Sequence, residues 1–234
     1  MLLDLFNDYR NGVADMPDLL IGALFTIIVV LLSLSLHECA HGYMAYKLGD
    51  PTARNLGRLT LEPTKHLDPI GAICMLFFGF GWAKPVPVNS RYFKKPRRDM
   101  ALTAFAGPVS NVILSFIGCL IIHIIVAISN LYSGESEFVF NLIYFSATFF
   151  SYLHYMNLYL ALFNLIPVPP LDGSRLMFLF LPDRLYFGLM KYERYISIAI
   201  LVLLYTGILS RPLSFIASYI SFGMTSLISL IPGL

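Results

Sequence analysis

The chain has 234 residues, of which 57% are hydrophobic and only 13% are charged, and its formal net charge is +2. It is too apolar for an ordinary soluble protein and too short for several domains, so one membrane-embedded domain of residues 1–234 is expected. No basic cluster interleaved with aromatic residues is present, so nucleic acid is not an expected partner. The three cysteines all lie in apolar surroundings, which argues against a disulfide framework.

The first predicted membrane span, residues 19–47, carries the motif HECAH near its end. A helix turns about 100° per residue, so His37 and His41 share one face and Glu38 lies beside them. Two imidazoles in this arrangement can bind one metal ion. Catalytic zinc also needs a third protein ligand, an open position for water and a carboxylate that accepts the water's proton, a task that suits Glu38. Ionisable residues are costly in lipid, so their position after an uncharged run indicates function.

The region between the first and second spans predicts short, irregular elements. Alternating leucines at 56–61 favour extended structure. His66 is expected to be a polar loop residue or a residue that supports a metal ligand, rather than a ligand itself. Residues 69–81 are apolar but only thirteen in number and glycine-rich, which suits a re-entrant element. In the segment 83–89, Pro85 and Pro87 deprive one strand edge of donors. The other edge keeps its N–H groups and can form a ladder; it is formed by Lys84, Val86 and Val88.

Three further spans are predicted at 101–131, 138–166 and 196–209, whereas the sequence does not decide whether 212–234 crosses the membrane. Except for Arg10 and Arg211, the sixteen Lys and Arg residues lie at the end of the first span, between the first and second spans, or between the third and fourth. By the positive-inside rule, these regions face the cytoplasm. The predicted fold is an all-α, polytopic integral membrane bundle with a small re-entrant or β-hairpin element.

Several polar residues interrupt the later spans. Asn111 could either join two helices or belong to the site, and these two interpretations remain open. His123 is expected to be structural, and His154 is expected to form hydrogen bonds between helices. Asp172 follows the third span in a backbone broken by three prolines, and the topology places it on the same side of the membrane as the end of the HECAH helix.

The chain resembles the site-2 protease family, peptidase family M50, and specifically its compact bacterial members without PDZ or CBS domains. Four stretches carry the resemblance: HECAHGYMAYKLGDPTARNLGRLTLEPTKHLDPIG at 37–71, GFGWAKPVPVN at 79–89, AGPVSN at 106–111 and NLIPVPPLDG at 164–173. From the first to the last, they extend over residues 37–173, which is well over half of the chain. Glu62 stands where similar sequences often have Asn.

The resemblance implies an intramembrane zinc metalloprotease that binds one zinc ion through His37, His41 and Asp172, with Glu38 activating water. It implies that Asn111 and Asn164 lie near the site and position the substrate or transition state. The expected partners are the lipid bilayer and a transmembrane segment of another membrane protein, which is cleaved in the cell membrane towards the cytoplasmic side. An unwound substrate could add as a strand to the edge formed by Lys84, Val86 and Val88.

Other functions are also compatible with parts of this pattern. An ion-coupled transporter or channel uses intramembrane His and Glu residues, but it does not need a complete set of three metal ligands. A prenyl-protein-processing membrane protease also carries HExxH, although its third-ligand motif contains Glu, unlike the turn at Asp172. An inactive relative that sequesters substrates would not need Glu38. Substrate, trigger and oligomeric state cannot be read from the sequence.

Overall fold

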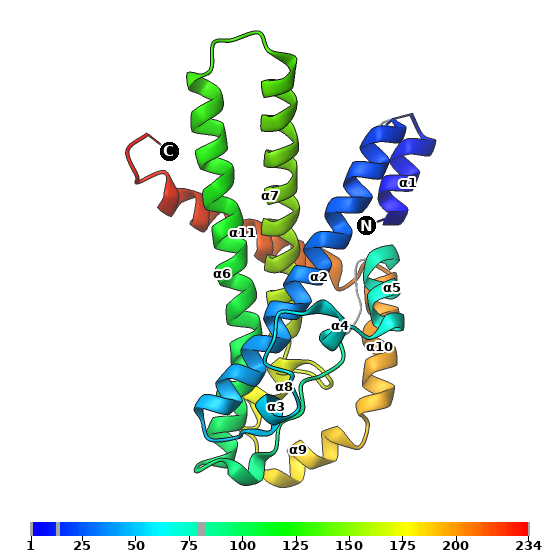
Figure 1. The fold of residues 1–234 in the computed structure, drawn as a ribbon. Helices are drawn as coiled ribbons and strands as arrows, with labels where there is room; N and C mark the ends of the chain where they lie inside the picture. The colour runs from blue at the N-terminus through cyan, green and yellow to red at the C-terminus, as the bar shows by residue number, and fades with distance from the viewer. Residues whose placement is uncertain (1, 13–14, 79–82, 234) are drawn as a thin grey trace. The chain divides into compact units, whose positions relative to one another are not determined.

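The computed structural model describes residues 2–12, 15–78 and 83–233, and its contacts group the chain into two compact units, Met1–Asp99 and Met100–Leu234. Both units are helical, and no β-strand forms among the described residues (Figure 1). The elements are α1 (Leu2–Arg10), α2 (Met16–Lys47), α3 (Thr52–Asn55), α4 (Pro63–His66), α5 (Pro69–Phe78), η1 (Ser90–Tyr92), α6 (Pro96–Leu131), α7 (Glu137–Asn164), α8 (Asp172–Met177), α9 (Asp183–Met190), α10 (Glu193–Tyr205) and α11 (Ser210–Ile228).

Within the described residues, α2 and α6 are the helices that are both long and apolar enough to cross a membrane. The predicted all-α class is therefore confirmed, but the number of spans stays a prediction. The fourth predicted span, 196–209, coincides only in part with α10, a helix of 13 residues. Gly207, shortly after the end of this helix, has a left-handed backbone conformation at φ 74°. A straight span needs about 20 residues, so α10 alone is too short.

Helix α2 is the central element of the first unit. The side chain of Asp15 caps its N-terminus by accepting a hydrogen bond from the Asp18 amide at 2.9 Å, and Gly49 follows its end at φ 109°. A capping carboxylate accepts from an unpaired N–H group at the start of a helix, and a left-handed glycine lets the chain satisfy the unpaired carbonyls at its end. Both residues lie next to the helix in the sequence, so the sequence itself sets where α2 begins and ends. Buried positions recur along α2 from Gly22 to Ala45, and the metal-binding motif belongs to this buried set.

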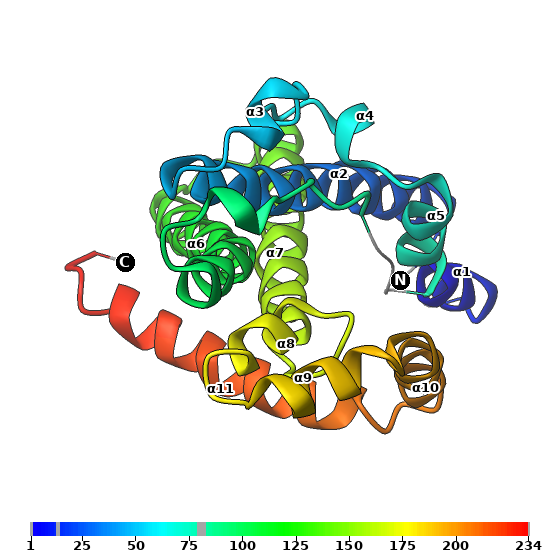
Figure 2. The same ribbon diagram turned by 90° about the horizontal axis from the view of Figure 1, so that it is seen from below.

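Four short helices pack against or beside α2: α1, α3, α4 and α5 (Figure 2). The expected extended structure at 56–61 is wrong, because Leu56 and Gly57 instead form a turn after α3, with Gly57 at φ 64°. β-pairing in the described residues is limited to one isolated antiparallel bridge between Leu67 and Ala83. The re-entrant element predicted at 69–81 contains α5, and its end at 79–81 lies outside the described residues.

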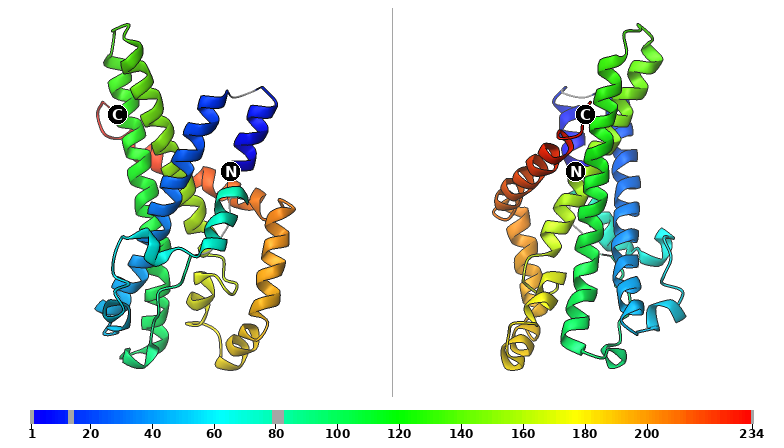
Figure 3. Two further views of the ribbon diagram at one scale, coloured as in Figure 1. Left: turned by 45° about the vertical axis from the view of Figure 1, so that its right-hand side comes forward. Right: turned by 90° about the vertical axis from the view of Figure 1, so that its left-hand side faces the viewer.

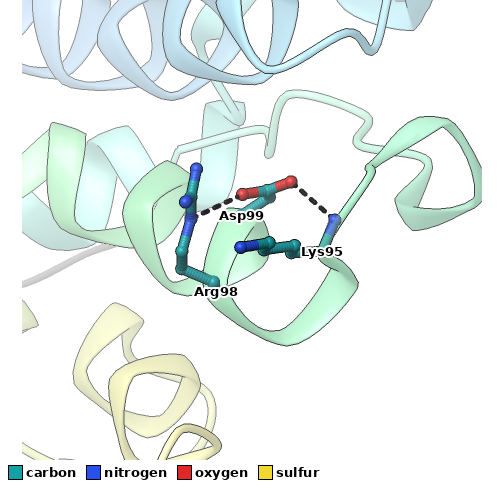
Figure 4. A network of polar contacts seen from close by, with 3 residues as sticks. All are labelled: Lys95, Arg98 and Asp99. Carbon is teal, nitrogen blue, oxygen red and sulfur yellow. Dashed lines mark hydrogen bonds and ion pairs between the residues drawn. The ribbon is translucent and has the colours of Figure 1, made fainter.

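Asp99 organises the start of α6, in a charged segment that precedes the second predicted span. Its carboxylate accepts hydrogen bonds from the Lys95 amide and from Nε of Arg98, each at 3.0 Å, while its own amide donates to the Lys95 carbonyl at 2.8 Å (Figure 4). This reciprocal pairing satisfies groups that a helix start leaves open, and an acidic side chain suits the positive end of the helix dipole. The charged segment therefore initiates a long apolar helix.

In the second unit, α6 and α7 lie side by side and antiparallel (Figures 1 and 3). Gly118 permits this close approach, because a Cβ there would lie 3.0 Å from the backbone nitrogen of His154. His154 bridges three helices, with Nδ1 2.9 Å from the Ser115 hydroxyl and Nε2 2.9 Å from the Ser221 hydroxyl. The predicted interhelical role of His154 is confirmed. The same three helices, α6, α7 and α11, form an apolar core: Cys119, Leu158, Ala217, Met224 and Ile228.

Candidate metal centre

His37 and His41 face each other on α2. Their Nε2 atoms are 3.0 Å apart, their ring centroids are 4.5 Å apart and the rings are nearly perpendicular at 87°. Both side chains are buried, with 5% and 8% of their surfaces exposed. The spacing of four residues on one helix places both rings on the same face, close enough to meet.

Glu38 completes a cluster of three potential metal-binding groups. One ligand atom from each of His37, Glu38 and His41 lies within 4.8 Å of the other two, and all three side chains are buried. Two nitrogens on a tetrahedral zinc ion, each at about 2.0–2.1 Å, are roughly 3.3 Å apart, which is close to the observed 3.0 Å. Neutral imidazoles beside a carboxylate are also ligands that zinc accepts. The residues present therefore fit a zinc ion.

The carboxylate of Glu38 has a second contact, which the sequence did not indicate. Its Oε2 accepts a hydrogen bond from the backbone N–H of Val86 at 2.9 Å, across 48 residues of chain. The Lys84 amide is also used internally and donates to the His66 carbonyl at 2.8 Å. Two of the three donors assigned to the substrate-binding edge are thus bonded within the protein, and an incoming strand would have to replace those bonds.

His66 itself is fully buried, although it was expected to be a loop residue. Its Nε2 lies 2.8 Å from the Thr60 carbonyl oxygen, while its Nδ1 has no hydrogen-bond partner in the described structure. It ends the short helix α4, which packs against α2. His66 therefore holds the loop before α4 rather than joining the His37 and His41 pair.

Asp172 is the first residue of α8 in the second unit and is half-buried. The turn before it is tight: a Cβ on Gly173 would collide with the carbonyl oxygens of Leu165 and Ile166, the two residues that follow α7. Only glycine therefore fits next to Asp172 without moving backbone. The structure describes Asp172 within its own unit, so its role as the third ligand stays a prediction.

Asn111 and Asn164 also belong to the second unit. Asn111 is fully buried on α6 and donates through Nδ2 to Oδ1 of Asn157 on α7 at 2.7 Å. Asn164, at the end of α7, donates to the Leu160 carbonyl of its own helix at 2.9 Å. The contact of Asn111 supports its role in joining two helices, and its role in the site remains a prediction, as does that of Asn164.

The sequence of the region that contains these groups identifies the family. A family model described as Peptidase family M50 matches residues 25–208, a stretch that includes both the HECAH motif and Asp172. The chain belongs to this family. As an M50 member it is a membrane zinc metalloprotease, and the buried cluster on α2 supplies the residues expected to hold its zinc ion.

Curated relatives agree with membership in M50. YwhC from Bacillus subtilis (strain 168), named as a candidate zinc metalloprotease, is 46% identical over 182 residues, which cover 78% of this chain and 80% of YwhC. Rip2 from Mycolicibacterium smegmatis, named in the same way, is 25% identical over 77% of this chain and 66% of its own length. Rip2 from Mycobacterium tuberculosis is 30% identical, and the match spans 52% of it. No solved structure matches this M50 chain.

Two residues, Gly42 and Asp50, were missed by the sequence analysis, which assigned Val86 to substrate binding without its contact to Glu38. Gly42 follows His41 directly, which was the one available signal. Asp50 is fully buried and accepts hydrogen bonds from the Thr52 and Asn89 amides at 3.0 and 2.6 Å. These contacts connect the end of α2 to the segment around Val86, and no periodicity in the sequence predicts them.

Proposed function

We propose that this M50 protein is an intramembrane protease that hydrolyses peptide bonds in or near the transmembrane segments of other membrane proteins. One observation carries the proposal: the buried His37, Glu38 and His41 cluster lies on α2, a helix apolar enough to cross a membrane. Buried ionisable groups are costly in such a helix unless they serve a site. A soluble metalloprotease would not need to put its metal site there.

One zinc ion per chain would be held by His37, His41 and Asp172. Two imidazoles and one carboxylate form a ligand set with an open position, as catalytic rather than structural zinc requires. When bound, zinc lowers the pKa of a coordinated water molecule and polarises the carbonyl of the scissile peptide. An ion-relay function would not require this third ligand.

Glu38 would act as the general base. Its carboxylate lies beside the imidazoles and is buried, so it can accept a proton from the attacking water and pass it to the leaving amine. Asn111 and Asn164 are proposed to position the substrate or the transition state. Because these residues come from both units, the proposal requires that residues 1–234 act as one catalytic domain.

The substrate would enter as a membrane helix and must unwind before cleavage, because its peptide groups are hydrogen-bonded within the helix. Addition to the edge at Lys84, Val86 and Val88 would replace those bonds. The two internal hydrogen bonds at Lys84 and Val86 oppose this mode, which therefore depends on an exchange of partners.

The decisive experiment is Glu38→Gln, which preserves shape and removes the basic carboxylate. We expect stoichiometric zinc by elemental analysis and a loss of cleavage of about 10²-fold or more for a single-span membrane protein in proteoliposomes. Glu135→Gln, on an exposed loop, is the matched control and should cleave normally. Cleavage by Glu38→Gln at the wild-type rate would refute the proposed chemistry.

The proposed topology is a multi-pass protein with its active site towards the cytoplasm. Single cysteines at Lys95 and Arg184, in a background lacking the native cysteines, should react with a membrane-impermeant maleimide from the cytoplasmic side. A cysteine at Glu135 should react from the opposite side. Labelling of all three positions from one side would contradict the proposed topology.

A further inference from the structure

The hydrogen bond between Val86 and Glu38 connects the proposed general base to backbone far away in the sequence. The Val86 amide donates to Oε2 of Glu38 at 2.9 Å, and both side chains are buried, with 7% and 8% of their surfaces exposed. A glutamate has three side-chain torsions, so it samples many orientations unless a contact restricts it. Here the contact comes from a backbone group, which moves far less than a side chain.

Residues 84–89, called the strap below, are fixed independently of Glu38. At one end, the Lys84 amide donates to the His66 carbonyl, and the Arg58 guanidinium donates to the Lys84 carbonyl at 2.8 Å. At the other end, the Asn89 amide donates to the buried carboxylate of Asp50 at 2.6 Å. Between these ends, two prolines restrict the backbone further. The strap can therefore hold the Val86 amide in a defined position.

Gly42 allows the strap to approach α2 at this point. It lies four residues after Glu38 and so on the same helix face. A Cβ built on Gly42 would be 2.8 Å from Cδ2 of Leu59 and 3.1 Å from Cγ1 of Val86. Any larger residue would push one or both of these side chains away from the helix. The absence of a side chain at 42 thus brings Val86 within hydrogen-bond distance of Glu38.

From these contacts we infer that the backbone amide of Val86 is a positioning group for Glu38. It holds Oε2, which leaves the other carboxylate oxygen to accept the proton from the attacking water. The same bond occupies the Val86 amide, so a substrate strand would gain this donor only by displacing Glu38. The inference rests on the proposed role of Glu38 as general base, and it assigns Val86 to catalysis where the sequence pattern suggested substrate binding.

Hydrogen–deuterium exchange of the resting enzyme tests the contact without any activity measurement. Between residues 85 and 88 only Val86 and Val88 carry amide hydrogens, because the other two residues are prolines. Fragment-resolved exchange should show a slow Val86 amide in the wild type and in Glu38→Gln, which keeps an acceptor oxygen. In Glu38→Leu, Val86 exchange should accelerate at least about tenfold, with Val88 unchanged. Equal Val86 exchange in the wild type and Glu38→Leu would overturn the inference.

Kinetics separate positioning from substrate binding. Val86→Pro removes the amide, whereas Val86→Ala keeps it and removes most of the side chain. We expect Val86→Pro to bind zinc normally and to lose about 10- to 100-fold in kcat with little change in KM, and Val86→Ala, which keeps the amide, to lose much less of its kcat than Val86→Pro. A raised KM with unchanged kcat in both Val86→Pro and Val88→Pro would instead assign the edge to substrate and overturn the inference.

Gly42→Ala provides a second variant if Val86→Pro does not fold. The added Cβ requires Cγ1 of Val86 to move by a few tenths of an ångström. Because a β-branched side chain has few alternative rotamers, we expect the backbone of the strap to move with it, so that the Val86 amide exchanges faster and kcat falls severalfold. Faster Val86 exchange with unchanged kcat would show that the contact is only structural.

If the wild-type enzyme cleaved no membrane protein, the proposed function would fail, while the exchange experiment would still decide whether Glu38 holds the Val86 amide.

Discussion

Buried histidines occur in both units of this protein, and their partners differ in kind. His154 in the second unit directs Nδ1 and Nε2 at serine hydroxyls on two neighbouring helices. His37 and His41 in the first unit direct one nitrogen of each ring at the other, 3.0 Å away. The two imidazoles can share one proton in a hydrogen bond at this distance, but both nitrogens also face one point beside a carboxylate, an arrangement that suits a shared cation. The partners of a buried histidine, rather than its burial, therefore distinguish packing from metal binding.

The largest expected effect is on zinc content, which should distinguish the metal-binding histidines from the packing histidine His154. We expect His37→Ala to reduce zinc from about one per chain to near zero, because one imidazole and one carboxylate do not replace a three-ligand site. His154→Ala should keep its zinc. Elemental analysis after dialysis against a weak chelator measures both variants, and stoichiometric zinc in His37→Ala would break the distinction.

Gly173→Ala tests whether the second unit contributes to the metal site through Asp172. The new methyl group would collide with the Leu165 and Ile166 carbonyl oxygens, so the turn must open and Asp172 must move. We expect zinc affinity to fall at least tenfold by competition with a fluorescent chelator. Gly188→Ala, where a Cβ has open space within α9, is the matched control and should leave affinity unchanged. Unchanged affinity in Gly173→Ala would argue against Asp172 as a ligand.

Unfolding of His154→Ala should show the smallest of the three effects. The change leaves the Ser115 and Ser221 hydroxyls without an imidazole partner and creates a cavity between helices, so we expect a destabilisation of about 2 kcal/mol. His123→Ala serves as the control, because its Nδ1 contacts the carbonyl oxygen and Sγ of Cys119, which lies on the same helix, α6. Thermal unfolding in detergent compares them, and equal midpoints would show that the His154 bridge adds no stability.

The sequence by itself determined the chemistry that one helix can carry. The HECAH spacing, read with the 100° turn per residue, placed two imidazoles on one face, and the structure brings their nitrogens together within α2. The same local reasoning predicted the long apolar helices and the interhelical role of His154. It succeeded because helix periodicity, end signals and hydropathy are properties of neighbouring residues.

Only the tertiary structure decided which distant groups meet the Glu38 carboxylate. Leucine alternation at 56–61 suggested extended structure, but the chain there turns after α3, and the strap lies against α2 instead. The Val86 amide, 48 residues from Glu38, reaches its carboxylate for two reasons. Asp50 and Arg58 bind the two ends of the strap, and Gly42 has no side chain that would keep the strap away from α2. Backbone amides are chemically alike at every non-proline position, so the sequence does not show which amide will bond to a given carboxylate. That choice depends on how the segments pack.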